Sequence, residues 1–183
     1  SPSAASIFEE GIRIPPIKIV RRGILQEDII RLVVNNTREP EDRNLDLKVQ
    51  IATNDFGVIQ TTKLIEKMGL EAMEVAVEDL LIYTSRRLKK HLLALKQGSS
   101  SFTTWMDDDG LEGQTLPLKA NVKIENGHLL IDFSGSGPQS RGAFNVMTTG
   151  VVATVSYAVK ALLDPDLPAN DGLYSVIQLN MPS

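Results

Sequence analysis

Apolar residues recur at helical spacing over two long stretches in the first half of the chain. A long helix is predicted from Pro40 to Met68. From Leu47 onward its seam positions recur at intervals of four and three residues, as in a coiled coil, with Asn54 and Thr61 as two polar interruptions. The stretch 71–96 is acidic at its start and basic at its end, which matches the dipole of a helix. Gly69 between the two is a natural C-terminal cap. The pattern predicts an antiparallel hairpin of two long helices, preceded by a shorter helix over 26–35.

The second half of the chain has the pattern of strands separated by turns. Strands are predicted over 100–106, 116–124, 128–133 and 175–180, with Asn126-Gly127 as a two-residue hairpin turn and a further helix over 145–163.

Near the start, the segment 7–16 contains Pro15-Pro16 and is predicted to be a fixed, non-helical loop, followed by a short strand at 17–20. The order of elements indicates an α+β (mixed α/β) fold, a long helical hairpin followed by a mostly antiparallel sheet with a further helix. Residues 26–97 form its mainly helical part and residues 98–183 its mainly β part.

Composition and charge exclude several classes of protein. The 183 residues include no cysteine and only two histidines, so a disulfide-stapled module, a cysteine zinc site and a three-histidine metal centre are ruled out. The net charge of −4 gives no support to nucleic-acid binding, and no apolar run is long enough to span a membrane. Without a signal peptide at its start, the chain is expected to be cytoplasmic. It does not begin with Met and ends directly after a predicted strand, so we expect a piece of a longer protein.

Small and polar residues gather in the segment 132–145, between a predicted strand and a predicted helix. Glycines allow backbone N–H groups to approach a ligand, and the start of a helix favours an anion. The spacing is not that of a P-loop, a dinucleotide-binding loop or a nucleophile elbow. Two interpretations stay open at this point, a ligand-binding loop and an ordinary connection.

Three further groups have ordinary structural explanations. The acidic segment 107–110 does not have the register of a calcium loop and is better explained as a turn. The basic cluster 86–91 is interpreted as a solvated helix end, in which His91 pairs with an acid or lies at a subunit contact. His128 follows a hairpin turn and is expected to be exposed. No grouping has the spacing of a catalytic triad, and no metal ligand is predicted.

Six segments together resemble the hydantoinase B/5-oxoprolinase family. They occur in the family's order and cover nearly the whole chain: 7–16, 35–40, 46–52, 107–110, 132–145 and 168–172. Each is weak alone, and the set of six is strong. Because the family's B component is much longer, the resemblance identifies the chain as a central fragment of such a subunit.

The resemblance implies an ATP-dependent system of two components. A hydantoinase A-type partner binds the nucleotide and phosphorylates the carbonyl, and the B component completes the ring-opening hydrolysis of a hydantoin or of 5-oxoproline. It also implies ATP through the partner subunit, a divalent metal in the intact complex, a homo- or hetero-oligomer and a fragment that is inactive alone, with neither cofactor held by the fragment. The alternatives are a ketone carboxylase of the acetone carboxylase type, a noncatalytic scaffold, and a small-molecule binding module that uses residues 134–145.

Seven motif positions are carried over from the resemblance as candidate substrate-binding residues, while the catalytic residues stay unassigned. They are Glu10, Arg13, Asp132, Ser134, Ser136, Gln139 and Asn145. A structural ion pair between Glu10 and Arg13 is an equally open interpretation. Lys48 and Thr53 depart from the small residues expected around 50–52, which leaves the subtype open.

Overall fold

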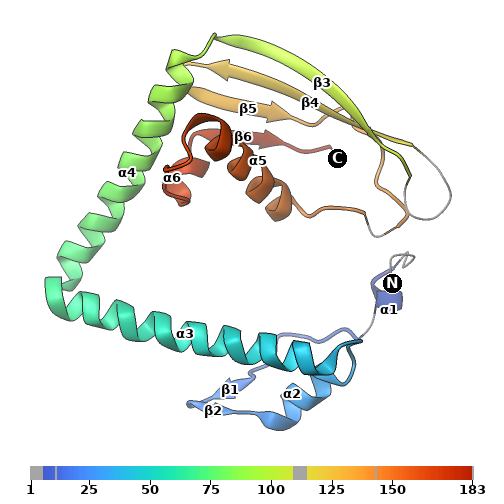
Figure 1. The fold of residues 1–183 in the computed structure, drawn as a ribbon, viewed down its shortest axis with the longest axis vertical. Helices are drawn as coiled ribbons and strands as arrows, with labels where there is room; N and C mark the ends of the chain where they lie inside the picture. The colour runs from blue at the N-terminus through green and yellow to red at the C-terminus, as the bar shows by residue number, and fades with distance from the viewer. Residues whose placement is uncertain (1–5, 11, 109–114, 143, 183) are drawn as a thin grey trace. The chain divides into compact units, whose positions relative to one another are not determined.

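The computed structural model describes residues 6–10, 12–108, 115–142 and 144–182. The chain divides into two compact units, one up to Met73 and one from Glu74 onward. Each unit is described by itself below, and Figure 1 gives the order of the elements along the chain.

The first unit begins with a short helix that the sequence pattern missed. Helix α1 (Ile7–Glu10) lies within the segment predicted to be a non-helical loop, so that prediction is wrong for its first residues. The reason is local, because the two prolines lie several residues downstream and leave Ile7–Glu10 free to turn. The Ser6 hydroxyl donates to the Glu9 carboxylate over 3.3 Å, the two residues of a capping-box sequence.

A two-stranded hairpin and a short helix follow. Strand β1 (Val20–Arg21) pairs antiparallel with β2 (Ile24–Leu25). The predicted short strand at 17–20 overlaps β1 only at Val20, and the sequence pattern does not predict β2. Helix α2 (Glu27–Val34) then begins with acidic residues in its first turn and buries Ile30 and Val34. The predicted helix over 26–35 is therefore confirmed to within a residue at each end.

The first long helix, α3 (Pro40–Met68), has the predicted bounds. Pro40 lies in its first turn, and Gly69 ends it with a φ of 86° that favours glycine. None of its side chains is buried. Because the second long helix belongs to the other unit, the predicted antiparallel packing of the two helices stays a prediction.

The second unit combines the other long helix with a four-stranded sheet. It contains all but the first four residues of α4 (Leu70–Ala94), which belong to the first unit. The other elements are β3 (Gly98–Met106), β4 (Leu116–Glu125), β5 (His128–Asp132), α5 (Thr148–Leu163), α6 (Asp171–Tyr174) and β6 (Ile177–Asn180). The strand order is β3-β4-β5-β6, with antiparallel pairs except for β5 and β6, which are parallel. The predicted α+β class and the mostly antiparallel sheet are confirmed.

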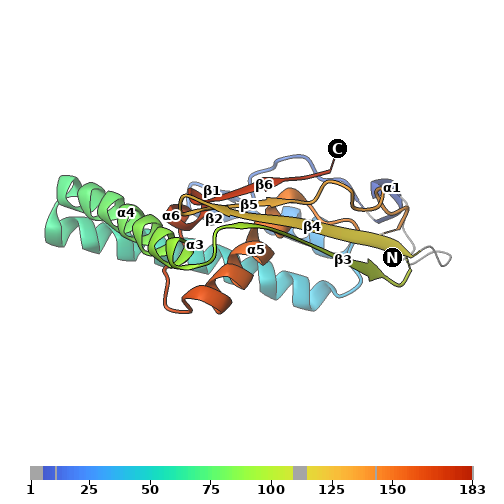
Figure 2. The same ribbon diagram turned by 90° about the horizontal axis from the view of Figure 1, so that it is seen from above.

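Helix α5 covers one face of this sheet, as the view from above shows (Figure 2). Leu129 and Ile131 of β5 meet Val155 and Val159 of α5 in a core that α4 completes with Leu88 and Leu92. The strands alternate, so the neighbours of these β5 residues point to the opposite, open face of the sheet. The open face carries the polar residues that are considered below.

The hairpin turn is confirmed, and two element boundaries differ from expectation. Asn126 and Gly127 both have positive φ angles, 52° and 75°, as a two-residue hairpin turn requires. Helix α5 begins at Thr148 instead of residue 145, because Met147 before it is extended. The last strand begins at Ile177 because residues up to Tyr174 form α6.

No helix among the described residues is long and apolar enough to cross a membrane. The predicted turn over 107–113 lies mostly outside the described residues.

Candidate functional site

The glycine-rich segment runs along the polar edge of the sheet, from the end of β5 to the start of α5 (Figure 1). The strand register places Asp132 opposite Asn121 of β4 on one side and opposite Asn180 of β6 on the other. Three polar residues of adjacent strands therefore form one row on the open face. Sequence reasoning had selected only Asp132, since Asn121 and Asn180 join it through strand pairing.

Asp132 is held as a carboxylate by its neighbours. Its Oδ1 accepts a hydrogen bond from the backbone N–H of Ser134 and another from Nδ2 of Asn180, each over 2.9 Å. Hydrogen bonds from the hydroxyl and the backbone amide of Ser134 lower the pKa of Asp132 below its ordinary value, with further contributions from Asn180 and the charge of Lys119. Both of these bonds use Oδ1, so the site presents an anionic acceptor at the end of β5.

Ser136 fastens the segment to the neighbouring strand. Its hydroxyl accepts the backbone N–H of Lys119 over 3.0 Å and lies within donating distance of the Phe133 and Lys119 carbonyls, at 2.8 and 3.2 Å. One residue further on, the Gly137 amide donates to the Pro117 carbonyl over 2.7 Å. Gly135 has a φ of 89° and leaves room for the Lys119 side chain, since a Cβ there would lie 3.2 Å from Lys119 Cδ. This half of the segment is therefore a turn that hydrogen bonds hold against β4.

Asn145 closes the second half of the segment. Its side-chain oxygen accepts the Ser140 N–H over 2.8 Å, and its Nδ2 donates to the carbonyls of Ser140 and Gly142 over 2.8 and 3.0 Å. Both the oxygen and the nitrogen of the Asn145 side-chain amide therefore bond to backbone groups of the segment. Gln139 lies between the two fastened halves, and its side chain is exposed.

The other two candidates belong to the first unit. Glu10 is the last residue of α1, and its side chain lies outside the described part of the chain. The Arg13 guanidinium lies 5.1 Å from the centre of the Phe8 ring, a cation–π contact. The proposed Glu10–Arg13 ion pair therefore stays a prediction. These two residues belong to the first unit, whereas the other five candidates belong to the second.

A buried ion pair corrects the interpretation of the basic cluster. The Asp164 side chain is only 6% exposed and forms a bidentate ion pair with Arg87. Nε of Arg87 donates to Oδ2, and Nη2 donates to Oδ1 over 2.7 Å. Nε2 of His91 lies 3.1 Å from the same carboxylate. The hydrogen bonds from Arg87, and to a smaller extent from His91, lower the pKa of Asp164 although burial opposes this shift. The expectation that His91 pairs with an acid is confirmed, whereas Arg87 is not part of a solvated helix end.

The segment 168–172 has a structural use. Asn170 caps α6 by accepting the Gly172 N–H over 3.0 Å, and its Nδ2 donates to the Thr84 hydroxyl of α4 over 3.1 Å. Thr84 is fully buried and its hydroxyl lies 2.9 Å from the Leu80 carbonyl. A Cβ on Gly172 would lie 2.2 Å from the Leu81 carbonyl oxygen. This family motif seats α6 directly on the backbone of α4.

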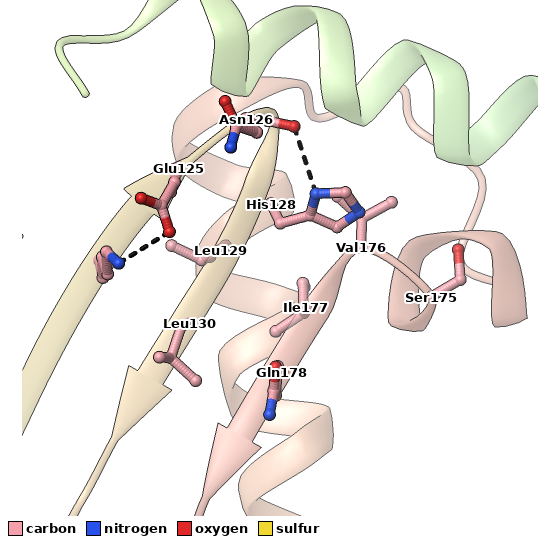
Figure 3. Close-up of a pocket in the computed structure, with 10 residues that line it drawn as sticks. Glu125, Asn126, His128, Leu129, Leu130, Ser175, Val176, Ile177 and Gln178 are labelled. Carbon is pink, nitrogen blue, oxygen red and sulfur yellow. Dashed lines mark hydrogen bonds and ion pairs between the residues drawn. The ribbon is translucent and has the colours of Figure 1, made fainter. Parts of the chain in front are cut away.

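A shallow pocket of about 320 Å³ opens at the hairpin end of the sheet (Figure 3). His128 lies at its rim, exposed as expected, with Nδ1 3.2 Å from the Asn126 carbonyl. The two charged side chains of the pocket, Lys123 and Glu125, pair with each other over 2.7 Å. This pocket offers few polar groups to a ligand beyond those that already contact one another.

The described residues contain no group of three or more His, Asp or Glu side chains that is suited to hold a metal ion.

Comparison with known protein families identifies the class of protein that has this fold and this glycine-rich segment. The family model for hydantoinase B/oxoprolinase matches residues 1–183, the whole chain. The chain belongs to the hydantoinase B/oxoprolinase family, as its six motif segments predicted.

Two curated relatives show how much of a family member the chain represents. An uncharacterized protein of Methanocaldococcus jannaschii is 34% identical over 184 residues, which span 100% of this chain and 32% of that protein. The 5-oxoprolinase 1 of Arabidopsis thaliana is 27% identical over 100% of this chain and 16% of its own length. The chain thus spans a third or less of these relatives.

Two solved structures share the fold. The ATP-dependent caprolactamase of Pseudomonas jessenii superposes with a TM-score of 0.85 at 25% identity, over 98% of this chain and 31% of that chain. A nucleotide-free acetone carboxylase superposes with a TM-score of 0.76 at 17% identity, over 93% and 24%. At that lower identity the second likeness establishes the fold alone.

Proposed function

We propose that this chain is part of the B-type subunit of an ATP-dependent hydrolase that opens cyclic amides, such as hydantoins or 5-oxoproline, together with a hydantoinase A-type subunit. The observation that carries the proposal is the likeness to the ATP-dependent caprolactamase along nearly the whole chain. The subunit named caprolactamase subunit beta in that organism is 26% identical over 99% of this chain, and 5-oxoprolinases match over a similar range.

The chemistry divides naturally between two subunits. An amide is a poor electrophile, and phosphorylation of its oxygen converts that oxygen into a leaving group. In this proposal the partner subunit binds ATP and phosphorylates the carbonyl, and a divalent metal belongs to the intact complex. In this proposal the B-type subunit holds the ring while water adds to the activated carbon and the ring nitrogen leaves with a proton as an amine. A second water then releases the phosphate from the resulting acyl phosphate and leaves a carboxylate.

The hydrogen-bond partners divide the candidate residues into two roles. The Ser136 hydroxyl bonds to backbone groups of Phe133 and of Lys119 on β4, and Asn145 bonds to backbone groups within the segment. We therefore assign both residues to its shape. Asp132 and the exposed Gln139 keep polar atoms toward solvent, and we assign them to contacts with the substrate. An ionised Asp132 would accept the N–H of a cyclic amide.

The test uses the complete B-type subunit with its hydantoinase A-type partner, ATP and magnesium. Ring opening of hydantoin, 5-oxoproline and caprolactam is measured together with ADP release. Asp132→Asn keeps the shape of the side chain and should raise KM by about tenfold or more, since it removes a charged acceptor. Lys90→Gln, on an exposed surface of α4, is the control. ADP release without ring opening of any of the three substrates would contradict the proposal.

The same assay separates the alternatives. Carboxylation of acetone in the presence of bicarbonate would identify a ketone carboxylase, and an unchanged partner activity without this subunit would identify a scaffold. Cytoplasmic location and assembly into an oligomer stay predictions that belong to this proposal.

A further inference from the structure

A hollow beside the β1–β2 hairpin of the first unit is lined by three positively charged residues and by no acidic one. It has a volume of about 770 Å³, and its lining residues are Pro16, Ile17, Lys18, Val20, Arg21 and Arg22. The three cationic side chains are exposed. In the described part of the chain, no side-chain hydrogen bond or ion pair occupies them. In a protein with a net charge of −4, three adjacent cations without acidic partners form a local site of positive potential.

Arg22 occupies a backbone position with a positive φ angle that does not favour arginine. Arg22 and Gly23 form the two-residue turn between β1 and β2, with φ angles of 52° and 78°. The other such turn in this protein places Asn126 at the equivalent position, also with a φ of 52°. Asparagine, aspartate and glycine are the residues that accept this conformation at low cost, whereas an arginine there is strained. A turn that tolerates Asn126 in one hairpin has no conformational need for arginine in the other.

The cations stand on a fixed frame. Pro16 forms one wall, and its ring and that of Pro15 restrict the backbone there. The hairpin forms the other wall, and beyond the strand pairs it is extended by a hydrogen bond of 2.8 Å from the Gln26 N–H to the Ile19 carbonyl. A ligand that enters the hollow therefore meets charges on a backbone that is already ordered, which lowers the entropic cost of binding.

We propose that this hollow, the hairpin pocket, binds a small anion that bears a phosphate group. Three cations require more than one negative charge, and a phosphate monoester carries about two near neutral pH. Two guanidinium groups offer paired donors that suit phosphate oxygens. A monocarboxylate would leave two of the three cations without a counter-charge. The volume is that of a small-molecule site, which favours a small anion over the flat face of an acidic protein.

Calorimetric titration of the complete B-type subunit that contains this chain, with inorganic phosphate and with pyrophosphate, tests the proposal. Pyrophosphate should bind more tightly than phosphate, because it carries more charge, and sodium acetate at equal ionic strength should not compete. Backbone amide shifts in the NMR spectrum should change in residues 17–24 and stay unchanged along α4.

The decisive variant is Arg22→Asn. It removes one cation and replaces a strained residue by the one found in the other hairpin, so the hairpin should be retained or stabilised. Affinity for pyrophosphate should fall by about fivefold or more. The variant Lys18→Gln/Arg21→Gln/Arg22→Asn should lose detectable binding.

The matched control removes three exposed cations at the end of α4 and just beyond it, by Arg86→Gln, Lys90→Gln and Lys96→Gln. It should retain the affinity for pyrophosphate within about twofold. Three results would each overturn the proposal: no binding of pyrophosphate up to about 10 mM, an unchanged affinity in Arg22→Asn, or an equal loss in the α4 control.

Discussion

The contact of α6 with α4 makes Gly172 the most informative position to perturb. Its Cα faces the backbone of α4, and a Cβ built there would lie 2.2 Å from the carbonyl oxygen of Leu81 and 3.0 Å from Oδ1 of Asn170. Real Cβ atoms do not approach a carbonyl oxygen so closely. The obstructing atom belongs to the helix backbone and cannot rotate away, so Gly172→Ala requires α6 to move off α4.

The expected cost can be worked out from this geometry. Overpacking of a closely packed site costs about 1–3 kcal/mol, and rigid backbone neighbours favour the upper part of that range. A shift of α6 also weakens the Asn170–Thr84 hydrogen bond of 3.1 Å, which adds about 1 kcal/mol. Alanine is the better helix former, which returns about 1 kcal/mol. We expect Gly172→Ala to destabilise the second unit by about 2–3 kcal/mol.

Gly57→Ala provides the matched control. Gly57 lies inside α3, where an added Cβ would meet nothing within 4 Å. The same substitution should therefore stabilise its helix by about 1 kcal/mol. Urea unfolding followed by circular dichroism, with amide hydrogen exchange at 171–176, measures both effects. A Gly172→Ala protein that is as stable as the parent, with unchanged protection of these amides, would refute the proposed close contact.

Four further substitutions test the polar contacts of the second unit. Because its partners lower the folded pKa of Asp164, this carboxylate contributes stability that is present above its ordinary pKa and is lost as the pH falls through the lowered value. Asp164→Asn should therefore lower the urea midpoint at pH 7 and flatten its dependence on pH below about 4. Asn145→Ala should destabilise the second unit by about 1 kcal/mol and increase amide exchange at Ser140. Unchanged exchange there would contradict the role of the Asn145 hydrogen bonds. Ser136→Ala should cost about 1–2 kcal/mol, because it leaves the Lys119 N–H without its acceptor, and Ser134→Ala should cost less; equal urea midpoints for the two variants would contradict this order.

The long elements could be predicted because many residues contribute to each pattern. α3, α4 and the three antiparallel strands carry several repeats of their hydrophobic period, and capping or turn residues such as Gly69 and Asn126-Gly127 mark their ends. The short elements carry no such repetition. α6 depends on contacts of Asn170 and Gly172 with α4, and β2 depends on a turn that begins with an unfavourable arginine.

The candidate site divides in the same way. The segment 132–145 could be selected from its composition and from the family resemblance, since both are local properties of the sequence. Asn180 joins Asp132 only because β6 pairs with β5, and the two residues are 48 positions apart. Arg87 and Asp164 are 77 positions apart, and the helix-dipole argument had already accounted for the arginine. Long-range pairs of this kind leave no local signal.

Family motifs in this chain are largely requirements of the backbone. The segment 168–172 seats α6 on α4, and Ser136 and Asn145 hold the two halves of the glycine-rich segment by their hydrogen bonds to the backbone. In this chain these residues therefore serve the shape of the backbone. Under the proposed function, we expect substrate preference to depend on side chains that the fold leaves open, such as Asp132 and Gln139. It follows that exchanging Gln139 between family members should alter substrate choice, whereas exchanging Asn145 should alter stability first.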